Sequence, residues 1–205
     1  MAAPHHVVRQ PKQARSRDGW ERALEVGLAL IEEGGVEALT VTEVCRRSGI
    51  NAPSLYARVD GRAGLFTAVW ERGMTDVRAT EERVLAGLPR ADADPAERAA
   101  SAASAIAEVF ATHVRFLRAV IGRSESDPVL LEHGAEESRR LLAGVAAALQ
   151  TDPEVAREAA QTLYAECVLR TIYGADFFTG AAESDDAFRA RLARSVAARI
   201  ESAPR

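Results

Sequence analysis

Residues 40–62 read TVTEVCRRSGINAPSLYARVDGR, a spacing typical of two short helices joined by a tight turn. Thr40 and Glu43 stand three positions apart, as in a capping box, where each side chain satisfies a backbone N–H of the other residue. Gly49 supplies the left-handed residue that ends the first helix, and Asn51 caps the second. The stretch predicts a helix-turn-helix, whose second helix has the size to enter the major groove of DNA.

The apolar positions of this stretch predict which side chains face inward. Val41 and Val44 share one side of the first helix, and Leu55 faces the core from the second. Cys45 takes a further inward position that suits a small residue. Three side chains that follow are left facing outward: Ser54, Tyr56 and Arg58.

These motifs together resemble the DNA-binding domain of the TetR/AcrR family of transcriptional regulators, over about residues 20 to 70. The matching motifs are Gly34-Gly35, Leu39-Thr40-Val41-x-Glu43-Val44, Gly49-Ile50, Ser54-Leu55-Tyr56, and Arg62 shortly before Leu65. The chain departs from the family pattern at residues 57–59, where an aromatic-His-Phe run is frequent, and at Arg62, where Lys is frequent. The resemblance implies an all-α fold, with a three-helix DNA-binding domain followed by a helical bundle that binds a ligand and dimerises.

The remaining chain also predicts helices, because alternation of β-branched residues persists nowhere. Three expected helices begin at Asp-Pro pairs, in which Asp caps and Pro fills the first helical position. The expected helices beside the helix-turn-helix are 17–33, 63–86, 95–121, 128–150, 153–178 and a last one capped by Ser184. We therefore divide the chain into a basic arm (1–16), a helix-turn-helix domain (17–62) and a ligand-binding and dimerisation domain (63–205).

The charge of the chain is unevenly distributed. The 205 residues are 47% hydrophobic and 27% charged, which is ordinary for a globular protein, and carry a net charge of -4. Residues 1–17 nevertheless hold four basic residues and no acidic one, and residues 40–62 hold four arginines against two acids. This asymmetry fits a local DNA-binding face on an otherwise acidic protein.

The sequence lacks the signatures of membrane proteins, secreted proteins, metalloproteins and common enzymes. No stretch approaches the roughly 20 apolar residues of a membrane span, and the N-terminus lacks the apolar core of a signal peptide. Cys45 and Cys167 have neither metal nor redox spacing, so we expect two buried thiols in a reducing cytoplasm, without metal or cofactor. Glu132-His133 lacks the second histidine of a zinc-protease helix, and no nucleophile–base pair stands out.

The candidate DNA contacts divide into phosphate-binding and base-reading side chains. The hydroxyl of Tyr56 can donate to a phosphate, a role that the family resemblance also implies, and Arg62 beside helix amides can form a phosphate clamp. Arg58 can contact guanine or a phosphate, and the basic arm can reach a minor groove. The alternatives are a helix cap for Thr40, a purely structural surface residue for Tyr56 and a solvated charge for Arg62. The complete set is Thr40, Thr42, Ala52, Pro53, Ser54, Tyr56, Arg58 and Arg62.

The bundle carries an aromatic set at helical spacing, which suits either a ligand pocket or plain core. Its candidate ligand-binding residues are Trp70, Met74, Phe110, His113, Phe116, Leu117, Tyr164, Cys167, Arg170, Tyr173 and Phe177. The family resemblance further implies that the last two helices pair across a two-fold axis. Their stripes consist of Ala156, Ala160, Leu163, Val168, Leu192, Val196 and Ile200.

The functional interpretations remain three. The first is a repressor that an apolar small molecule releases from a palindromic double-stranded DNA operator. This repressor would act as a homodimer, because symmetric half-sites need a symmetric protein. The second is a DNA-binding activator or repressor without a small-molecule effector. The third, more remote, is an all-α enzyme.

Overall fold

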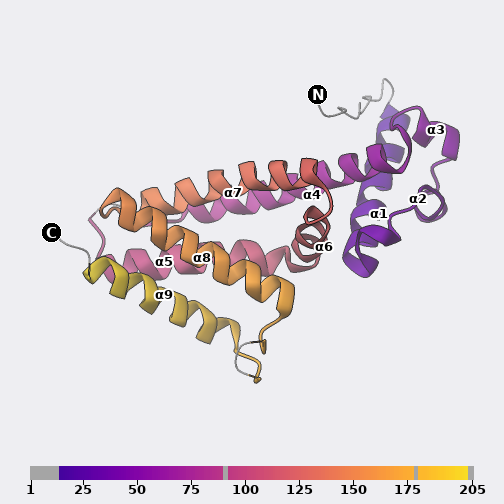
Figure 1. Cartoon of the computed structure of the whole chain (residues 1–205). Coiled ribbons are helices and arrows are strands. Elements are labelled where there is room, and N and C mark those ends of the chain that lie inside the picture. Colours follow the sequence, from indigo (N-terminus) through magenta and orange to yellow (C-terminus); the bar gives the residue numbers. More distant parts are fainter. Residues whose placement is uncertain (1–13, 90–91, 178–179, 203–205) are drawn as a thin grey trace. The chain divides into compact units, whose positions relative to one another are not determined.

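The computed structural model describes residues 14–89, 92–177 and 180–202 of the chain. Within these ranges it contains nine α-helices and no β-strand, which confirms the expected all-α class (Figure 1). Each helix there is too short or too polar to span a lipid bilayer. The helices are α1 (Ala14–Ala38), α2 (Val41–Ser48), α3 (Ala52–Tyr56), α4 (Gly61–Ala86), α5 (Pro95–Thr112), α6 (Val114–Ser124), α7 (Pro128–Leu149), α8 (Pro153–Tyr173) and α9 (Asp185–Glu201).

The described residues form two compact units. One contains the chain up to Val77 together with Arg115–Leu130, and the other contains Arg78–Val114 and the chain from Leu131 onward. Helix α4 therefore contributes residues to both units. Most of the expected basic arm, residues 1–13, lies outside the described ranges.

The first unit is organised by α1 and the helix-turn-helix. The regular part of α1 ends at the predicted Gly34-Gly35 pair, where Gly35 adopts φ 72° and ψ -178°, a conformation open to glycine alone. Gly27 lets α1 approach α4 closely, because a Cβ there would overlap the side chain of Val69. Trp20 and Ile31 of α1 are buried, as the predicted stripe requires.

The predicted helix 95–121 is wrong, because the structure breaks it into α5 and α6 at His113. His113 has φ -111° and ψ 23°, and its Nε2 lies 2.8 Å from the hydroxyl of Thr80 on α4. Its neighbours Thr112 and Val114 are β-branched and weak helix formers, which lowers the cost of interrupting the helix there.

The predicted end of the helix that starts at Pro153 is also wrong. Helix α8 stops at Tyr173, five residues before the expected end, because Gly174 adopts φ 97° and ψ 177°, outside the helical region. Phe177 consequently lies in a turn beyond the helix rather than on it. The Asp caps are confirmed: Asp94 and Asp152 accept backbone N–H groups of α5 and α8. Asp127 accepts from the N–H of Leu130.

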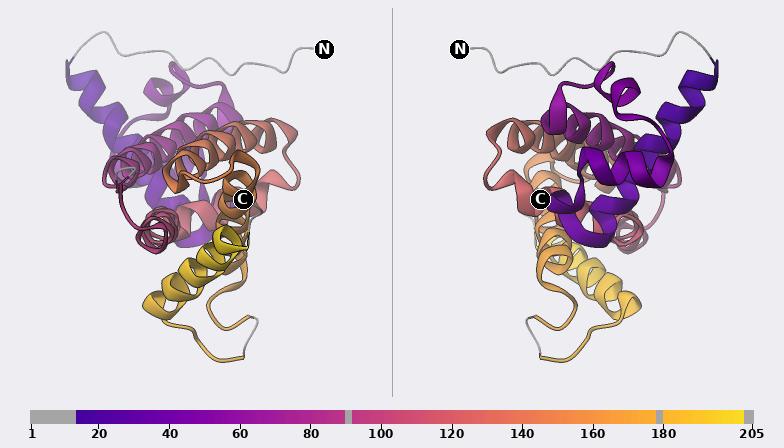
Figure 2. Two further views of the ribbon diagram at one scale, coloured as in Figure 1. Left: turned by 90° about the vertical axis from the view of Figure 1, so that its left-hand side faces the viewer. Right: turned by 90° about the vertical axis from the view of Figure 1, so that its right-hand side faces the viewer.

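The core of the second unit is built where α5, α8 and α9 lie side by side (Figure 1). Helix α9, yellow in Figure 2, begins at the expected cap, where Ser184 accepts from the N–H of Ala187 at 3.2 Å. It packs on α5, whose inward positions are mostly alanines that permit close approach. Arg98 of α5 also donates to the carbonyl of Leu149, the last residue of α7, and so satisfies a helix-end acceptor.

This packing corrects the predicted pairing surface of the last two helices. Five residues of the two stripes are buried inside the chain itself: Ala156, Ala160, Leu163, Leu192 and Val196. The other two, Val168 and Ile200, are half-buried. The apolar stripes are therefore core, and a dimer contact through α8 and α9 must use their other faces.

Candidate functional site

The capping box of α2 forms in one direction. The hydroxyl of Thr40 accepts the backbone N–H of Glu43 at 3.2 Å, as predicted. The Glu43 carboxylate, expected to return this bond, instead accepts from Arg46 and Arg47, which follow it at helical spacing. These hydrogen bonds lower the pKa of Glu43 to about 2, so the group stays ionised. Arg46 and Arg47 are not among the candidate DNA contacts chosen from the sequence. Their spacing of three and four residues from Glu43 nevertheless predicts these ion pairs.

The turn and α3 form as the sequence predicts. Gly49 adopts φ 75° and ψ 5°, and its N–H bonds back to the carbonyl of Cys45. Asn51 accepts the N–H of Ser54 at 2.8 Å, and Pro53 stands in the first turn, where it removes no helical hydrogen bond. Leu55 is fully buried and anchors this short helix to the unit.

This anchoring leaves one side of α3 and the start of α2 open to solvent. Tyr56 is 52% exposed, although tyrosine is a residue that folding usually covers in large part. Pro53, Ser54, Thr40 and Thr42 are exposed as well, and Ala52 is half-buried. Five of the eight candidate DNA contacts are thus accessible to solvent on α2 and α3 or at the cap of α2.

The predicted outward orientation of Arg58 is wrong. Its side chain is only 7% exposed, and its guanidinium carbon lies 5.4 Å from the centroid of the Trp20 ring. Helix α3 already ends at Tyr56, so the direction of Arg58 follows the turn after α3 rather than helical spacing. A guanidinium over an aromatic face is attracted by the ring, and its stem covers apolar surface. Arg58 therefore packs the domain and is not positioned to read bases.

Arg62 lies in the first turn of α4 and is held by the end of α1 and the residue that follows it. Its Nε donates to the carbonyl of Leu39 at 3.0 Å, and its Nη2 donates to the carbonyl of Val36 at 3.1 Å. The same Nη2 meets the carboxylate of Glu37 at 2.8 Å, which lowers the pKa of that carboxyl group. Arg62 therefore ties the end of α1 to the start of α4, in addition to any contact with phosphate.

The candidate ligand-binding residues are divided between the two units. In the first unit Trp70, Met74, Phe116 and Leu117 are buried, and the Phe116 ring lies against Gly73. In the second unit Phe110 and Tyr164 meet edge to face, with ring centroids 5.3 Å apart. Burial raises the pKa of the Tyr164 hydroxyl, which lies 2.5 Å from the Ser138 hydroxyl. These residues have the contacts of core side chains.

Two of the candidates lie on the surface instead. Tyr173 and Phe177 are each more than half exposed and stack on one another at 4.4 Å between centroids. The early end of α8 explains this arrangement. Phe177 lies in the turn that follows the helix, and its ring stacks on Tyr173, the last residue of α8. Cys167 is buried as expected, and burial raises the pKa of its thiol to about 12, whereas Cys45 is only half-buried.

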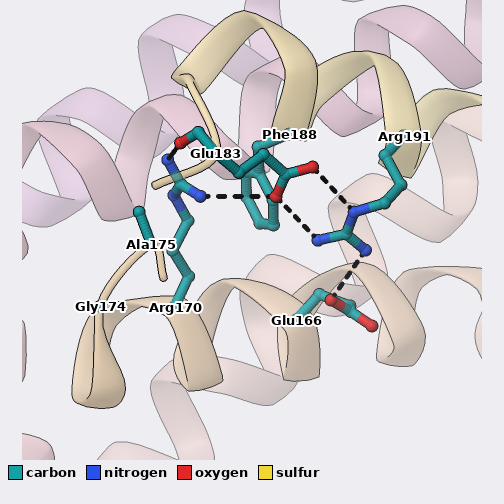
Figure 3. A pocket seen from close by; sticks show the side chains of 7 residues that line it. All are labelled: Glu166, Arg170, Gly174, Ala175, Glu183, Phe188 and Arg191. Atoms are coloured by element: carbon teal, nitrogen blue, oxygen red, sulfur yellow. Dashed lines mark hydrogen bonds and ion pairs between the residues drawn. The ribbon is translucent and has the colours of Figure 1, made fainter. Parts of the chain in front are cut away.

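A cavity of about 300 Å³ lies in the second unit, where the end of α8 meets the start of α9 (Figure 3). Of the candidate ligand-binding residues, Arg170 alone lines it. Its other lining residues are Glu166, Gly174, Ala175, Glu183, Phe188 and Arg191. Spacing along the sequence does not bring this set together, because Glu183 and Arg191 come from a loop and a helix more than ten residues beyond Arg170.

Comparison with known proteins supports the resemblance. Residues 23–69 match the model of bacterial regulatory proteins of the tetR family. Over 72 residues the chain is 38% identical to the HTH-type transcriptional repressor BdcR of Escherichia coli (strain K12). Residues 23–69 of the chain thus form a DNA-binding domain of the tetR family type. The matched region covers 35% of this chain and 34% of BdcR, so the chain matches about a third of that relative.

Solved structures extend the likeness in fold to most of the chain. A transcriptional regulator from Rhodococcus sp. Rha1 superposes with a TM-score of 0.68 at 20% identity, over 88% of this chain and 95% of the other. A TetR-like transcriptional regulator from Rhodococcus sp. RHA1 gives 0.65 at 17% identity, over 96% and 100% of the two chains. The match over residues 23–69 favours a DNA-binding regulator over an all-α enzyme.

Proposed function

We propose that the protein is a transcriptional regulator that binds a near-palindromic DNA operator as a homodimer. The observation that carries this proposal is the exposed surface of α2 and α3 around Tyr56, held in place by buried Leu55. A short helix that is capped, anchored and open on one side has the form of a recognition helix. The name of BdcR, a repressor, supports repression as the direction of control.

The proposal assigns phosphate contact to the Tyr56 hydroxyl, with support from Thr40 and Thr42 at the start of α2. Pro53, Ser54 and half-buried Ala52 offer short apolar and hydroxyl contacts to base edges in the major groove. Since these side chains are short, direct readout of bases is modest, and backbone contacts supply a large part of the affinity.

The short length of the recognition helix α3 requires a dimer. One helix of five residues reads few base pairs, and a two-fold dimer doubles the site. We assign the contact to the outward faces of α8 and α9, because their inward stripes are occupied within the chain. Sedimentation equilibrium should give a dimer at micromolar concentration, and a monomer that binds its operator tightly would contradict the assignment.

The regulation that we propose is release of the operator by a small, largely apolar molecule bound in the domain 63–205, while residues 17–62 read DNA. Ligand and operator are then reciprocally coupled, typically by about 1–3 kcal/mol. The second interpretation, a regulator without effector, predicts that compounds bound to the bundle leave operator affinity unchanged. Since the operator lies on the chromosome, we expect the protein in the cytoplasm.

The experiment that tests DNA binding uses selection from a random duplex library, followed by gel shift on the recovered sequence. Tyr56→Ala should weaken binding about tenfold, in line with loss of a contact worth roughly 1.4 kcal/mol. Tyr173→Ala is the matched control, because Tyr173 is also 52% exposed but lies at the end of α8. Recovery of no sequence in common, or equal losses in the two variants, would refute the assigned surface.

A further inference from the structure

The cavity between α8 and α9 contains a carboxylate held by two arginines. Arg191 grips the Glu183 carboxylate through two donors, Nε at 3.0 Å and Nη2 at 3.2 Å, and Arg170 Nη1 lies 3.5 Å from the same group (Figure 3). Two parallel N–H groups of a guanidinium match the two oxygens of a carboxylate in both spacing and charge. This is the geometry by which proteins recognise small organic acids, here filled by a side chain of the chain itself.

Both arginines have supports that do not involve the Glu183 carboxylate. Arg170 donates to the backbone carbonyl of Glu183 at 2.7 Å and to Asp185 at 2.9 Å. Arg191 donates to Glu166 at 3.1 Å. The two guanidinium groups also lie over the buried ring of Phe188, with their carbons 4.5 and 5.2 Å from its centroid. The pair therefore stays oriented when the carboxylate of Glu183 leaves, which is the preorganisation that a binding site needs.

The room beside the arginines suits a small molecule. The cavity of about 300 Å³ stands at the lower end of the range for ligand pockets. Gly174 and Ala175 line it and carry almost no side chain, so an apolar body can lie against them. Glu183 belongs to the connection just before the cap of α9, and its side chain can turn into water while its backbone bonds remain.

We propose that this cavity binds a small organic carboxylate, whose charged group replaces that of Glu183 between Arg170 and Arg191. Glu183 is then a tethered competitor, which occupies the site in the absence of ligand and lowers the apparent affinity. The hydrogen bonds from Arg191 lower the pKa of Glu183, which agrees with a position that favours an anion. The proposal concerns ligand binding alone and needs neither DNA nor an operator.

The test is calorimetric titration of the full chain with benzoate, and with benzamide as the uncharged analogue of equal size. Glu183→Gln keeps the shape of the competitor but removes its charge, so it should bind benzoate roughly tenfold more tightly than the unaltered chain. Arg191→Gln should abolish binding, and benzamide should not bind to any variant. Arg157→Gln, an exposed arginine of α8 remote from the cavity in sequence, should bind as the unaltered chain does.

Arg191→Lys covers the case in which Arg191→Gln does not fold, because it keeps the positive charge and loses the paired donors. It should weaken benzoate binding at least severalfold. Failure of Glu183→Gln to bind benzoate, or binding that neither Arg191 variant weakens, would overturn the proposal. A failed gel shift with normal benzoate binding would count against the DNA reader alone, so the two proposals fail separately.

Discussion

At the scale of single residues, the two arginines selected as DNA contacts show what spacing can and cannot predict. The positions of Arg58 and Arg62 in the sequence indicate where the backbone passes, but a long flexible side chain takes whichever partners the fold brings near it. Arg58 meets the face of Trp20, and Arg62 meets the carbonyls of Val36 in the last turn of α1 and of Leu39 just after it. Those partners are 38 and more than 20 residues away, beyond the reach of local pattern.

The hydrogen bonds of Arg62 lead to the first prediction. Arg62→Ala should lower the free energy of unfolding by about 1–2 kcal/mol, because donors to two backbone carbonyls and to Glu37 are lost. The lower end is appropriate, since the side chain is 49% exposed. Urea denaturation measures this change. Unaltered stability together with a shallower salt dependence of DNA binding would instead assign Arg62 to phosphate contact.

The two cysteines give the second prediction. At about pH 8, iodoacetamide should modify Cys45 readily and leave Cys167 unmodified in the native protein, because the thiolate is the reactive form. Burial keeps the pKa of Cys167 near 12, whereas the Cys45 side chain is partly accessible. Mass spectrometry of peptides after timed labelling measures the two rates, and denatured protein serves as the control in which both react. Equal native rates would show that the α8 position opens easily.

At the scale of helices, the sequence predicted starts better than ends. The caps at Thr40, Asn51, Asp94, Asp152 and Ser184 all form, because a cap is a contact between residues three positions apart or fewer. The break at His113 could not be foreseen, since neither Gly nor Pro marks it and its partner Thr80 is 33 residues away. The early end of α8 had a visible signal in Gly174, which the apolar continuation through Phe177 concealed.

The close approach of α1 and α4 leads to the third prediction. Gly27→Ala should destabilise the protein by about 1–3 kcal/mol, because the new methyl overlaps the side chain of Val69 in a packed core. Gly122→Ala on α6 is the matched control, since a Cβ there meets no atom within 4 Å. That control should stabilise by up to about 1 kcal/mol through helix propensity. Thermal unfolding of both variants measures the two changes in stability. Equal shifts of the midpoint temperature in the same direction would contradict the packing of α1 on α4.

At the scale of the whole molecule, the sequence predicted the all-α class and the exposed helix-turn-helix to which we assign DNA contact. It did not predict the cavity between α8 and α9. Caps and turns are local, so the helix-turn-helix could be derived from 23 adjacent residues. The cavity that the structure presents depends on Glu183 and Arg191, whose roles appear only once α9 lies on α8. An aromatic stripe cannot distinguish ligand contact from core, because both need the same apolar side chains at the same helical spacing.

The buried carboxyl group of Glu81 gives the fourth prediction, which concerns stability against pH. Burial raises the pKa of Glu81 above its ordinary value of 4.5, although Arg140 donates to it. The folded chain therefore holds this proton more tightly than the unfolded chain, and the resulting stabilisation is lost as the pH rises through the folded pKa.

Glu81→Gln removes the contribution that protonation of Glu81 makes to the free energy of unfolding. The stability of Glu81→Gln relative to the unaltered protein should therefore improve between about pH 4 and about pH 8, as urea midpoints at several pH values will measure. The neighbouring exposed Glu82→Gln is the control and should show a flatter difference. A relative stability of Glu81→Gln that declines with pH would mean that the ion pair with Arg140 outweighs burial.

The packing of α9 on α5 has a consequence for co-translational folding of the protein. About 70 residues separate the end of α5 from the start of α9, and at roughly 5–20 residues per second the ribosome needs about 4–15 s to make them. During that interval the alanine-rich face of α5 has no α9 to cover it, while the helix-turn-helix already has all of its own caps. Synthesis thus yields the helix-turn-helix first and a closed bundle last. In between, the exposed apolar face of α5 is a target for chaperones and for aggregation.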